Sequence, residues 1–179
     1  MAAASGAREP VGDQATPPIT VGEMAVRPAR PDDAEIVHHI LTTAPAPRDV
    51  TLEQLLEQFE QAPLDDGRGQ WVVEVAGGVV GWMSLRDPQH EAGSLEVSVY
   101  LEPGLTGKGH APRLLEAFLI PAAKRGGAEW LTAIPDTPHA ERFLEDCGFQ
   151  LPWADAGHDP IAAKLDSSSQ GGNVWVRRI

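Results

Sequence analysis

A strand, a glycine-rich loop and a long helix follow one another between Leu95 and Ala122, and this order constrains the fold more than any other segment. Apolar and polar residues alternate from Leu95 to Leu101, the period of two that predicts a strand. A loop with small residues at Gly107, Gly109 and Ala111 follows, and apolar residues then recur at helical spacing up to Ala122. Because the first amides of a helix lack internal partners and glycine lets a ligand approach the backbone, the loop is suited to bind phosphate.

The loop does not match two other phosphate-binding motifs. No Gly-Lys-Ser/Thr follows at the spacing of a Walker loop. No acidic residue closes the next strand near Ile134 to hold a ribose, as a dinucleotide-binding fingerprint requires. On the loop alone, a connection that binds no ligand remains the alternative, and a nucleotide remains a weaker choice of ligand.

The rest of the chain alternates between strand and helix patterns. Two capping boxes, Asp32 with Glu35 and Thr51 with Gln54, predict the starts of two helices. Interleaved strands and helices predict an α/β (α+β) domain with one central sheet and about four helices. Besides the segment above, we expect strands at 24–30, 70–75, 79–85, 130–134, 161–165 and 174–179, a Gly-Gly turn within Ala76-Gly77-Gly78, and a helix at 138–147 capped by Thr137.

Composition narrows the class of protein. The formal net charge of −12 disfavours nucleic acid as a partner, and no apolar run is long enough to predict a membrane span. The single cysteine, Cys147, excludes an internal disulfide framework and is expected to be a buried small side chain. With no recognisable secretion signal, a cytoplasmic location is expected. Residues 1–23 are predicted to be a flexible extension, and residues 24–179 the folded domain.

Four motifs resemble the GNAT superfamily of N-acetyltransferases, most closely its phosphinothricin-acetyltransferase-like members. Val26-Arg-Pro-Ala-Arg-Pro-Asp-Asp33 is similar to the first strand and helix start, and Glu96-Val-Ser-Val-Tyr100 to the fourth strand of that family. Thr106 to Ala111 stands where the family has Arg/Gln-x-x-Gly-x-Gly/Ala, and Ala140 to Phe149 matches its helix ending in Gly-Phe. The motifs occur in the family's order over about two-thirds of the chain.

The resemblance implies a mixed, mostly antiparallel sheet with one splayed parallel strand pair. It implies direct transfer of an acetyl group from acetyl-CoA to an amine of a small molecule or peptide, without a metal, and it allows a homodimer. The acceptor itself is not identified by the sequence. By position in the motifs, the cofactor would contact Val99, Tyr100, Leu101, Thr106, Gly107, Lys108, Gly109, His110, Ala111 and Thr137.

Departures from the family pattern leave a second hypothesis open. Thr106 replaces the usual Arg or Gln, and Pro112 removes an amide near the helix start. Thr137 stands where Asn is common, and Leu144 where a Tyr commonly protonates the leaving thiolate. The alternative is therefore a CoA-binding sensor or interaction domain with little or no catalysis.

Glu96 and Tyr100 are the candidate catalytic residues. Strand alternation puts Glu96, Ser98 and Tyr100 on the face opposite Leu95 and its apolar neighbours. A carboxylate beside a cleft can take a proton from an ammonium group, and the phenol of Tyr100 can supply one to the thiolate. The alternatives are a solvated carboxylate and a packing aromatic.

Two further groups of side chains are expected to have no part in the chemistry. The six histidines do not show metal-ligand spacing. Glu141 and Arg142 are expected to form a solvated helix face.

Overall fold

The computed structural model describes residues 18–61, 67–87, 93–151 and 174–179. These residues form a seven-stranded sheet in which the strands lie in sequence order. All neighbours are antiparallel except β5 and β6, which are parallel, so the expected mixed, mostly antiparallel sheet is confirmed. The strands are β1 (Ile19–Val21), β2 (Met24–Pro28), β3 (Gly69–Val75), β4 (Gly78–Arg86), β5 (Ser94–Leu101), β6 (Trp130–Ala133) and β7 (Trp175–Arg178).

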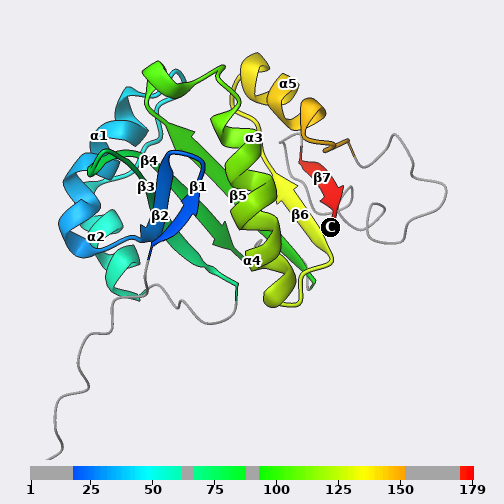
Figure 1. Cartoon of the computed structure of the whole chain (residues 1–179), viewed down its shortest axis with the longest axis horizontal. Coiled ribbons are helices and arrows are strands. Elements are labelled where there is room, and N and C mark those ends of the chain that lie inside the picture. The colour runs from blue at the N-terminus through cyan, green and yellow to red at the C-terminus, as the bar shows by residue number, and fades with distance from the viewer. Residues whose placement is uncertain (1–17, 62–66, 88–92, 152–173) are drawn as a thin grey trace, which may run out of the picture.

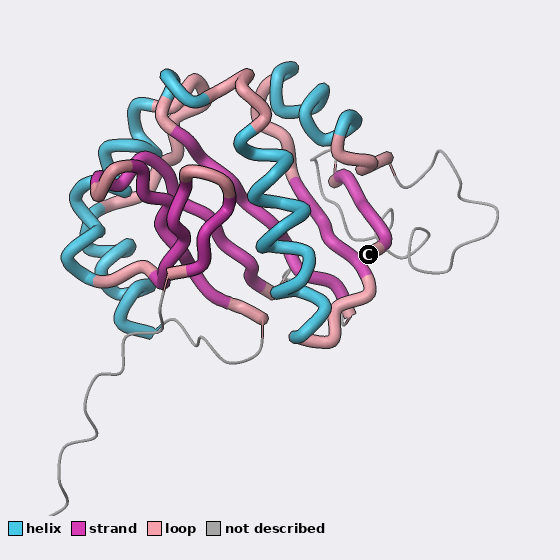
Figure 2. The backbone as a smooth tube through the Cα atoms, in the orientation of Figure 1, coloured by secondary structure: helices cyan, strands magenta, loops and turns pink. Residues whose placement is uncertain are grey.

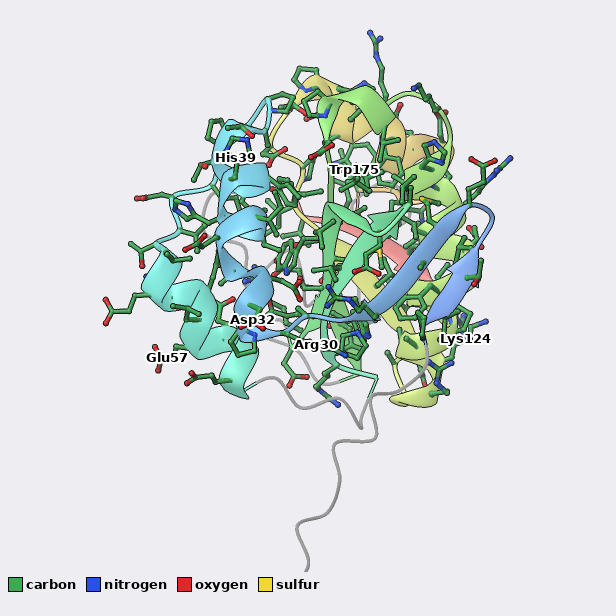
Figure 3. All side chains as sticks on the ribbon, turned by 60° about the vertical axis from the view of Figure 1, so that its left-hand side comes forward. Arg30, Asp32, His39, Glu57, Lys124 and Trp175 are labelled. Carbon is green, nitrogen blue, oxygen red and sulfur yellow. The ribbon has the colours of Figure 1, made fainter. Side chains whose placement is uncertain are left out.

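Helices cover both faces of the sheet. Figure 3 shows α1 and α2 on one side of the strands, and the helix that ends near Lys124 on the other. That second helix is continuous from α3 through η3 to α4 and crosses the front of the sheet in Figure 1. No helix in the described ranges is long and apolar enough to cross a membrane. The helical segments are η1 (Pro31–Asp33), α1 (Ala34–Thr43), α2 (Leu52–Gln61), η2 (Pro103–Leu105), α3 (His110–Leu114), η3 (Leu115–Leu119), α4 (Ile120–Arg125) and α5 (Pro138–Asp146).

Each face of the sheet has its own buried cluster. Leu95 and Val97 of β5 pack in the larger cluster with the α3–α4 helix, and Leu144 of α5 joins them. Tyr100 packs against the smaller cluster, which includes Trp82 and residues of α1 and α2. The alternation expected along β5 is thus observed, and the pairing of β4 with β5 runs without a register shift.

The parallel strands β5 and β6 separate after three paired residues. Ser94–Glu96 lie opposite Trp130–Thr132, whereas β5 continues to Leu101 with β4 alone as its partner. Figure 2 shows the loops that follow β5 and β6 at the same end of the sheet. The divergence opens a fork that residues of both strands line, among them Val99 and Tyr100 of β5 and Ala133 of β6.

The first capping box is wrong and the second is confirmed. Asp32 is exposed, whereas Asp33 is buried and accepts hydrogen bonds from the Arg30 N–H and, in a bidentate ion pair, from Arg27 at 2.7 and 2.8 Å. Before α2, Thr51 Oγ1 accepts from the Gln54 N–H, and the Gln54 side chain accepts from the Thr51 N–H. The ion pair with Arg27, six residues earlier in β2, therefore decides which aspartate is used at η1.

Two other boundaries differ from the sequence prediction, and one expected strand is not tested. The sheet begins before Met24, because Ile19–Val21 pairs with β2. The hairpin turn between β3 and β4 uses Ala76 (φ 51°) and Gly77 (φ 82°), so Gly78 already belongs to β4. The strand expected at 161–165 lies outside the described residues.

Candidate active site

The glycine loop after β5 borders a cavity of about 570 Å³, here called the loop cavity. Gly107 and Gly109 have φ values of +72° and +76°, a conformation that glycine adopts without strain. His110 begins α3, and its buried Nδ1 has no hydrogen-bond partner among the described residues. The other lining residues are Val99, Leu101, Leu105, Thr106, Ala111, Pro112, Thr137, His139, Ala140, Arg142, Phe143 and Asp146.

A second cavity of about 100 Å³ lies in the fork between β5 and β6, and we call it the fork cavity. Val99, Ala140 and Phe143 line both this cavity and the loop cavity, so the two adjoin. Leu144 closes part of its wall and is buried. The remaining lining residues are Arg48, Val97, Ser98, Tyr100, Leu115, Ala133, Ile134, Pro135, Asp136 and Phe149.

The hydroxyl of Tyr100 lies between a cation and a carboxylate in the fork cavity. It accepts a hydrogen bond from Arg48 Nε at 2.9 Å and donates one to Asp136 Oδ2 at 2.8 Å. Burial raises the pKa of Tyr100, and the hydrogen bond to Asp136 raises it further against the opposing effect of Arg48. The phenol therefore keeps its proton near neutral pH and can act as a proton donor.

A third cavity, of about 500 Å³, lies on the α1–α2 side of the sheet, and we call it the helix cavity. Its walls come from α1, the loop that precedes α2, α2 itself, and the facing ends of β3 and β4. Arg48 lines both this cavity and the fork cavity. The fork cavity therefore borders the loop cavity on one side, and the side chain of Arg48 lies between it and the helix cavity.

Glu96 lies on the same face of the sheet as Ser98 and Tyr100, but it lies outside the fork cavity and the helix cavity. It accepts hydrogen bonds from Nε and Nη2 of its cross-strand neighbour Arg86, the first at 3.1 Å, and its side chain is 13% exposed. It lines neither the fork cavity nor the helix cavity. The ion pair thus holds the carboxylate of Glu96 on Arg86, away from the fork cavity.

The structure brings most of the expected cofactor residues together at the loop and fork cavities. Lys108 is the exception, because it is exposed and lines neither of them. Arg142, expected to lie on a solvated face, is exposed but also lines the loop cavity beside His139. Thr137 caps α5, and its Oγ1 accepts from the Ala140 N–H at 3.1 Å.

Two functional candidates were missed by the sequence analysis. Arg48 comes from the loop between α1 and α2, and Asp136 from the loop after β6. Both meet Tyr100 across long sequence separations, of 52 and 36 residues. Neither residue belongs to a local motif, so only the fold could reveal the cluster.

Cys147 is buried, as expected, and its surroundings oppose thiol chemistry. Burial raises the pKa of the thiol to about 11, although the charge of Arg177 acts in the opposite direction. Among the described residues, no group of three or more His, Cys, Asp or Glu side chains could hold a metal ion.

Sequence comparison identifies the family. Residues 23–150 match the family model described as the acetyltransferase (GNAT) domain, and this span is more than half of the chain. This chain belongs to the GNAT acetyltransferase family. No curated protein matches its sequence.

Solved structures support the GNAT assignment. The yncA protein from Salmonella typhimurium, solved with its cofactor acetyl-CoA, is 28% identical, with 72% of this chain and 80% of that chain covered and a TM-score of 0.57. An acetyltransferase from Thermus thermophilus is 20% identical over 90% of this chain and 100% of that chain, with a TM-score of 0.64. N-acetylglutamate synthase from Neisseria gonorrhoeae, complexed with coenzyme A and L-arginine, is 23% identical over 87% of this chain and 33% of that chain, with a TM-score of 0.62. The last two, below 25% identity, support the fold alone.

The residues of the loop cavity fit acetyl-CoA, the cofactor bound in the structure of yncA. The unpartnered Nδ1 of His110 and the two glycines with positive φ offer polar and closely approachable surface to phosphate groups. A side-chain Cβ at Gly107 or Gly109 would meet no atom within 4 Å, so the space beside the loop is open.

Proposed function

We propose that this chain transfers the acetyl group of acetyl-CoA directly to the amine of an acceptor that enters through the helix cavity. The observation that carries the proposal is the Tyr100 hydroxyl, held between Arg48 and Asp136 in the fork cavity, which adjoins the loop cavity and shares Arg48 with the helix cavity. In this arrangement a thioester in the fork and an amine from the helix cavity would reach the same proton donor. Membership of the phosphinothricin-acetyltransferase-like subgroup stays a prediction.

The cofactor is assigned to the loop and fork cavities. Thr106, Gly107, Gly109, His110 and Ala111 would contact its phosphates, with Arg142 adding a cation from the facing helix α5; Lys108, which lines neither cavity, is left out of the proposed contacts. Val99, Tyr100 and Leu101 would lie along the pantetheine arm, and Thr137 would border it. Acetyl-CoA supplies an activated acyl group, whose carbonyl carbon accepts the amine.

The reaction requires proton transfers at the nitrogen and at the sulfur. The acceptor ammonium gives up one proton and its nitrogen bonds to the carbonyl carbon; as the carbon–sulfur bond breaks, the nitrogen loses a second proton and the sulfur gains one, so that one proton in all is released to solvent. Tyr100 is the proposed donor to the sulfur, because burial raises its pKa and keeps it protonated. It would take the role of the tyrosine that Leu144 replaces in the buried wall of the same cavity.

Two carboxylates compete for the role of proton acceptor. Glu96, the candidate from the sequence, is held by Arg86 outside the cavities, whereas Asp136 lines the fork cavity and hydrogen-bonds to Tyr100. Geometry favours Asp136, which can take the ammonium proton and return one to Tyr100. General-base catalysis contributes about 100- to 10,000-fold.

The function is tested by mixing the chain with acetyl-CoA and a panel of amines, and by measuring released thiol together with the acetylated product. Asp136→Asn should lower kcat by about 100-fold or more, and Glu96→Gln by less than about tenfold. The reverse order would assign the base to Glu96. No thiol release with any amine would reject the acetyltransferase proposal.

The alternative function is a CoA-binding domain without turnover. Leu144 supports it, because an apolar residue stands where the family usually has its proton donor. Saturable acetyl-CoA binding without acetylation of any amine would favour this alternative, whereas turnover that depends on Tyr100 would reject it.

A further inference from the structure

The helix cavity contains a cation, Arg48, that no carboxylate of the described residues neutralises in an ion pair. We propose that Arg48 binds a carboxylate of the acceptor, so that the acceptor is a compact molecule with its amine next to a carboxylate. This inference rests on the proposed function and adds the chemical class of the acceptor to it.

Arg48 has more hydrogen-bond donors than the structure gives it acceptors. Its Nε donates to the Tyr100 hydroxyl at 2.9 Å, and its Nη2 reaches Ser98 Oγ only at 3.4 Å. Within the described ranges no carboxylate lies at ion-pair distance from it, and Nη1 makes no hydrogen bond. A guanidinium has five N–H donors in a planar fork that suits two carboxylate oxygens. Arg48 is therefore equipped to bind an anion.

The other two arginines of the helix cavity already have carboxylate partners. Arg68 pairs with Asp87 at 2.7 Å, and Arg86 pairs with Glu96. Asp49 also lines the cavity, but it is exposed, and solvent screens its charge more than that of the partly buried Arg48. In each of these two ion pairs the charge of the carboxylate offsets that of the arginine. Arg48 is therefore the cation that an incoming anion meets without competition from a bound carboxylate.

The location of Arg48 sets how far the amine can be from the carboxylate. Its Nε is only 2.9 Å from the Tyr100 hydroxyl, and its side chain lines the fork cavity. In an α-amino acid the nitrogen is two bonds from the carboxyl carbon, so a carboxylate on Arg48 keeps the amine beside Tyr100 and Asp136. A polyamine has no carboxylate to bind Arg48. At a protein N-terminus the carboxyl group of the first residue forms a peptide bond and carries no charge.

The remaining walls fit a side chain without a full charge. Val50, Leu55 and Trp82 provide apolar surface, and Gln54 and Gln58 provide amides. The cavity volume of about 500 Å³ lies in the range of small-molecule sites, so a molecule as small as an amino acid can enter it. The acceptor class that agrees with these features is a free amino acid with an apolar or neutral polar side chain.

The test compares acceptors that differ only in the carboxylate. The twenty L-amino acids and their C-terminal amides are assayed with acetyl-CoA, and spermidine and a short peptide with a free N-terminus are included. For the best amino acid we expect a kcat/KM at least about tenfold above that of its amide, since hydrogen bonds to charged groups are the stronger ones. Amides, spermidine or peptide acetylated as well as the acids would overturn the inference and leave the proposed function standing.

Arg48→Gln separates anion binding from a merely structural role. It should raise KM about tenfold or more for the amino acid and leave KM for the amide within about threefold. Arg68→Gln, which removes a cation already paired with Asp87, should leave the ratio between acid and amide unchanged. An equal loss with acid and amide in the Arg48 variant would reject carboxylate binding. No turnover with any amine would overturn this inference together with the proposed function.

Discussion

Replacing Tyr100 by Phe removes one oxygen from the centre of the proposed site and little else. The ring would keep its contacts, because its centroid lies 6.1 Å from that of Trp82 and the Arg48 guanidinium lies 5.2 Å above it. The lost hydroxyl makes two hydrogen bonds, but Asp136 is exposed and can be solvated instead. The cost to the free energy of unfolding should thus be about 1 kcal/mol.

The expected cost to catalysis is much larger than the cost to stability. Loss of a positioned proton donor lowers the rate by about 100- to 10,000-fold, which corresponds to about 3–5 kcal/mol in the activation barrier. Steady-state thiol release should show this fall in kcat, while the affinity for acetyl-CoA should change by less than about threefold.

The pKa of the Tyr100 phenol can be measured directly alongside the kinetics. Tyr100 is the only tyrosine in the chain, so the phenolate absorbance of the folded protein titrates a single group. Its midpoint should lie above the ordinary pKa of about 10, because burial raises the pKa. A Tyr100→Phe variant with kcat within threefold of the parent would refute the assignment of Tyr100 as the proton donor.

Three further predictions concern stability and reactivity. The pKa of Asp33 is lowered, because the hydrogen bonds and charge of Arg27 and Arg30 outweigh burial. Its contribution to stability is therefore present above the unfolded pKa of about 4 and is lost as pH falls through the lower folded pKa. Asp33→Asn should destabilise the fold by about 2–4 kcal/mol at neutral pH, and urea unfolding measured at a series of pH values should show a weaker loss of stability in acid. Thr51→Ala removes the cap of α2 and should cost about 1 kcal/mol in the same assay. With a pKa raised to about 11 by burial, Cys147 should resist a thiol reagent near pH 8 until the protein unfolds, and Cys147→Ala should keep its turnover; fast native labelling or loss of activity would contradict this.

Local chemistry explains which parts of the fold could be predicted from sequence. Thr51 and Gln54 satisfy each other within one turn, so the start of α2 follows from four residues. Asp33 prevails over Asp32 because Arg27, six residues earlier in β2, binds it in a bidentate pair. The capping-box pattern of Asp32 with Glu35 does not contain that information.

The long helix shows the same limit. Its apolar spacing predicted a helix, but Leu115–Leu119 forms a π-helical turn directly before Pro121. Proline has no N–H and clashes with the carbonyl four residues earlier, which a wider turn relieves. The apolar spacing alone predicts an unbroken α-helix, whereas Pro121 changes the hydrogen-bond pattern of the turn before it.

The candidate site was predictable on one strand and one loop only. The shared face of Ser98 and Tyr100 follows from strand alternation, and the structure agrees. Arg48 and Asp136 reach that face from two other loops. Their role depends on the divergence of β5 and β6, which is a property of the whole sheet.

The central claim, that the loop cavity binds acetyl-CoA, is tested most directly by calorimetric titration of the full chain with acetyl-CoA and, in parallel, with ATP. Gly109→Leu places a side chain in the open space beside the loop, and Gly127→Leu is the matched control, with a similar φ of +75° and open space at the end of α4. We predict micromolar binding, about −8 kcal/mol, that favours acetyl-CoA over ATP, is lost in the Gly109 variant and is retained in the Gly127 variant. No saturable binding of acetyl-CoA, or equal binding of ATP, would contradict the account.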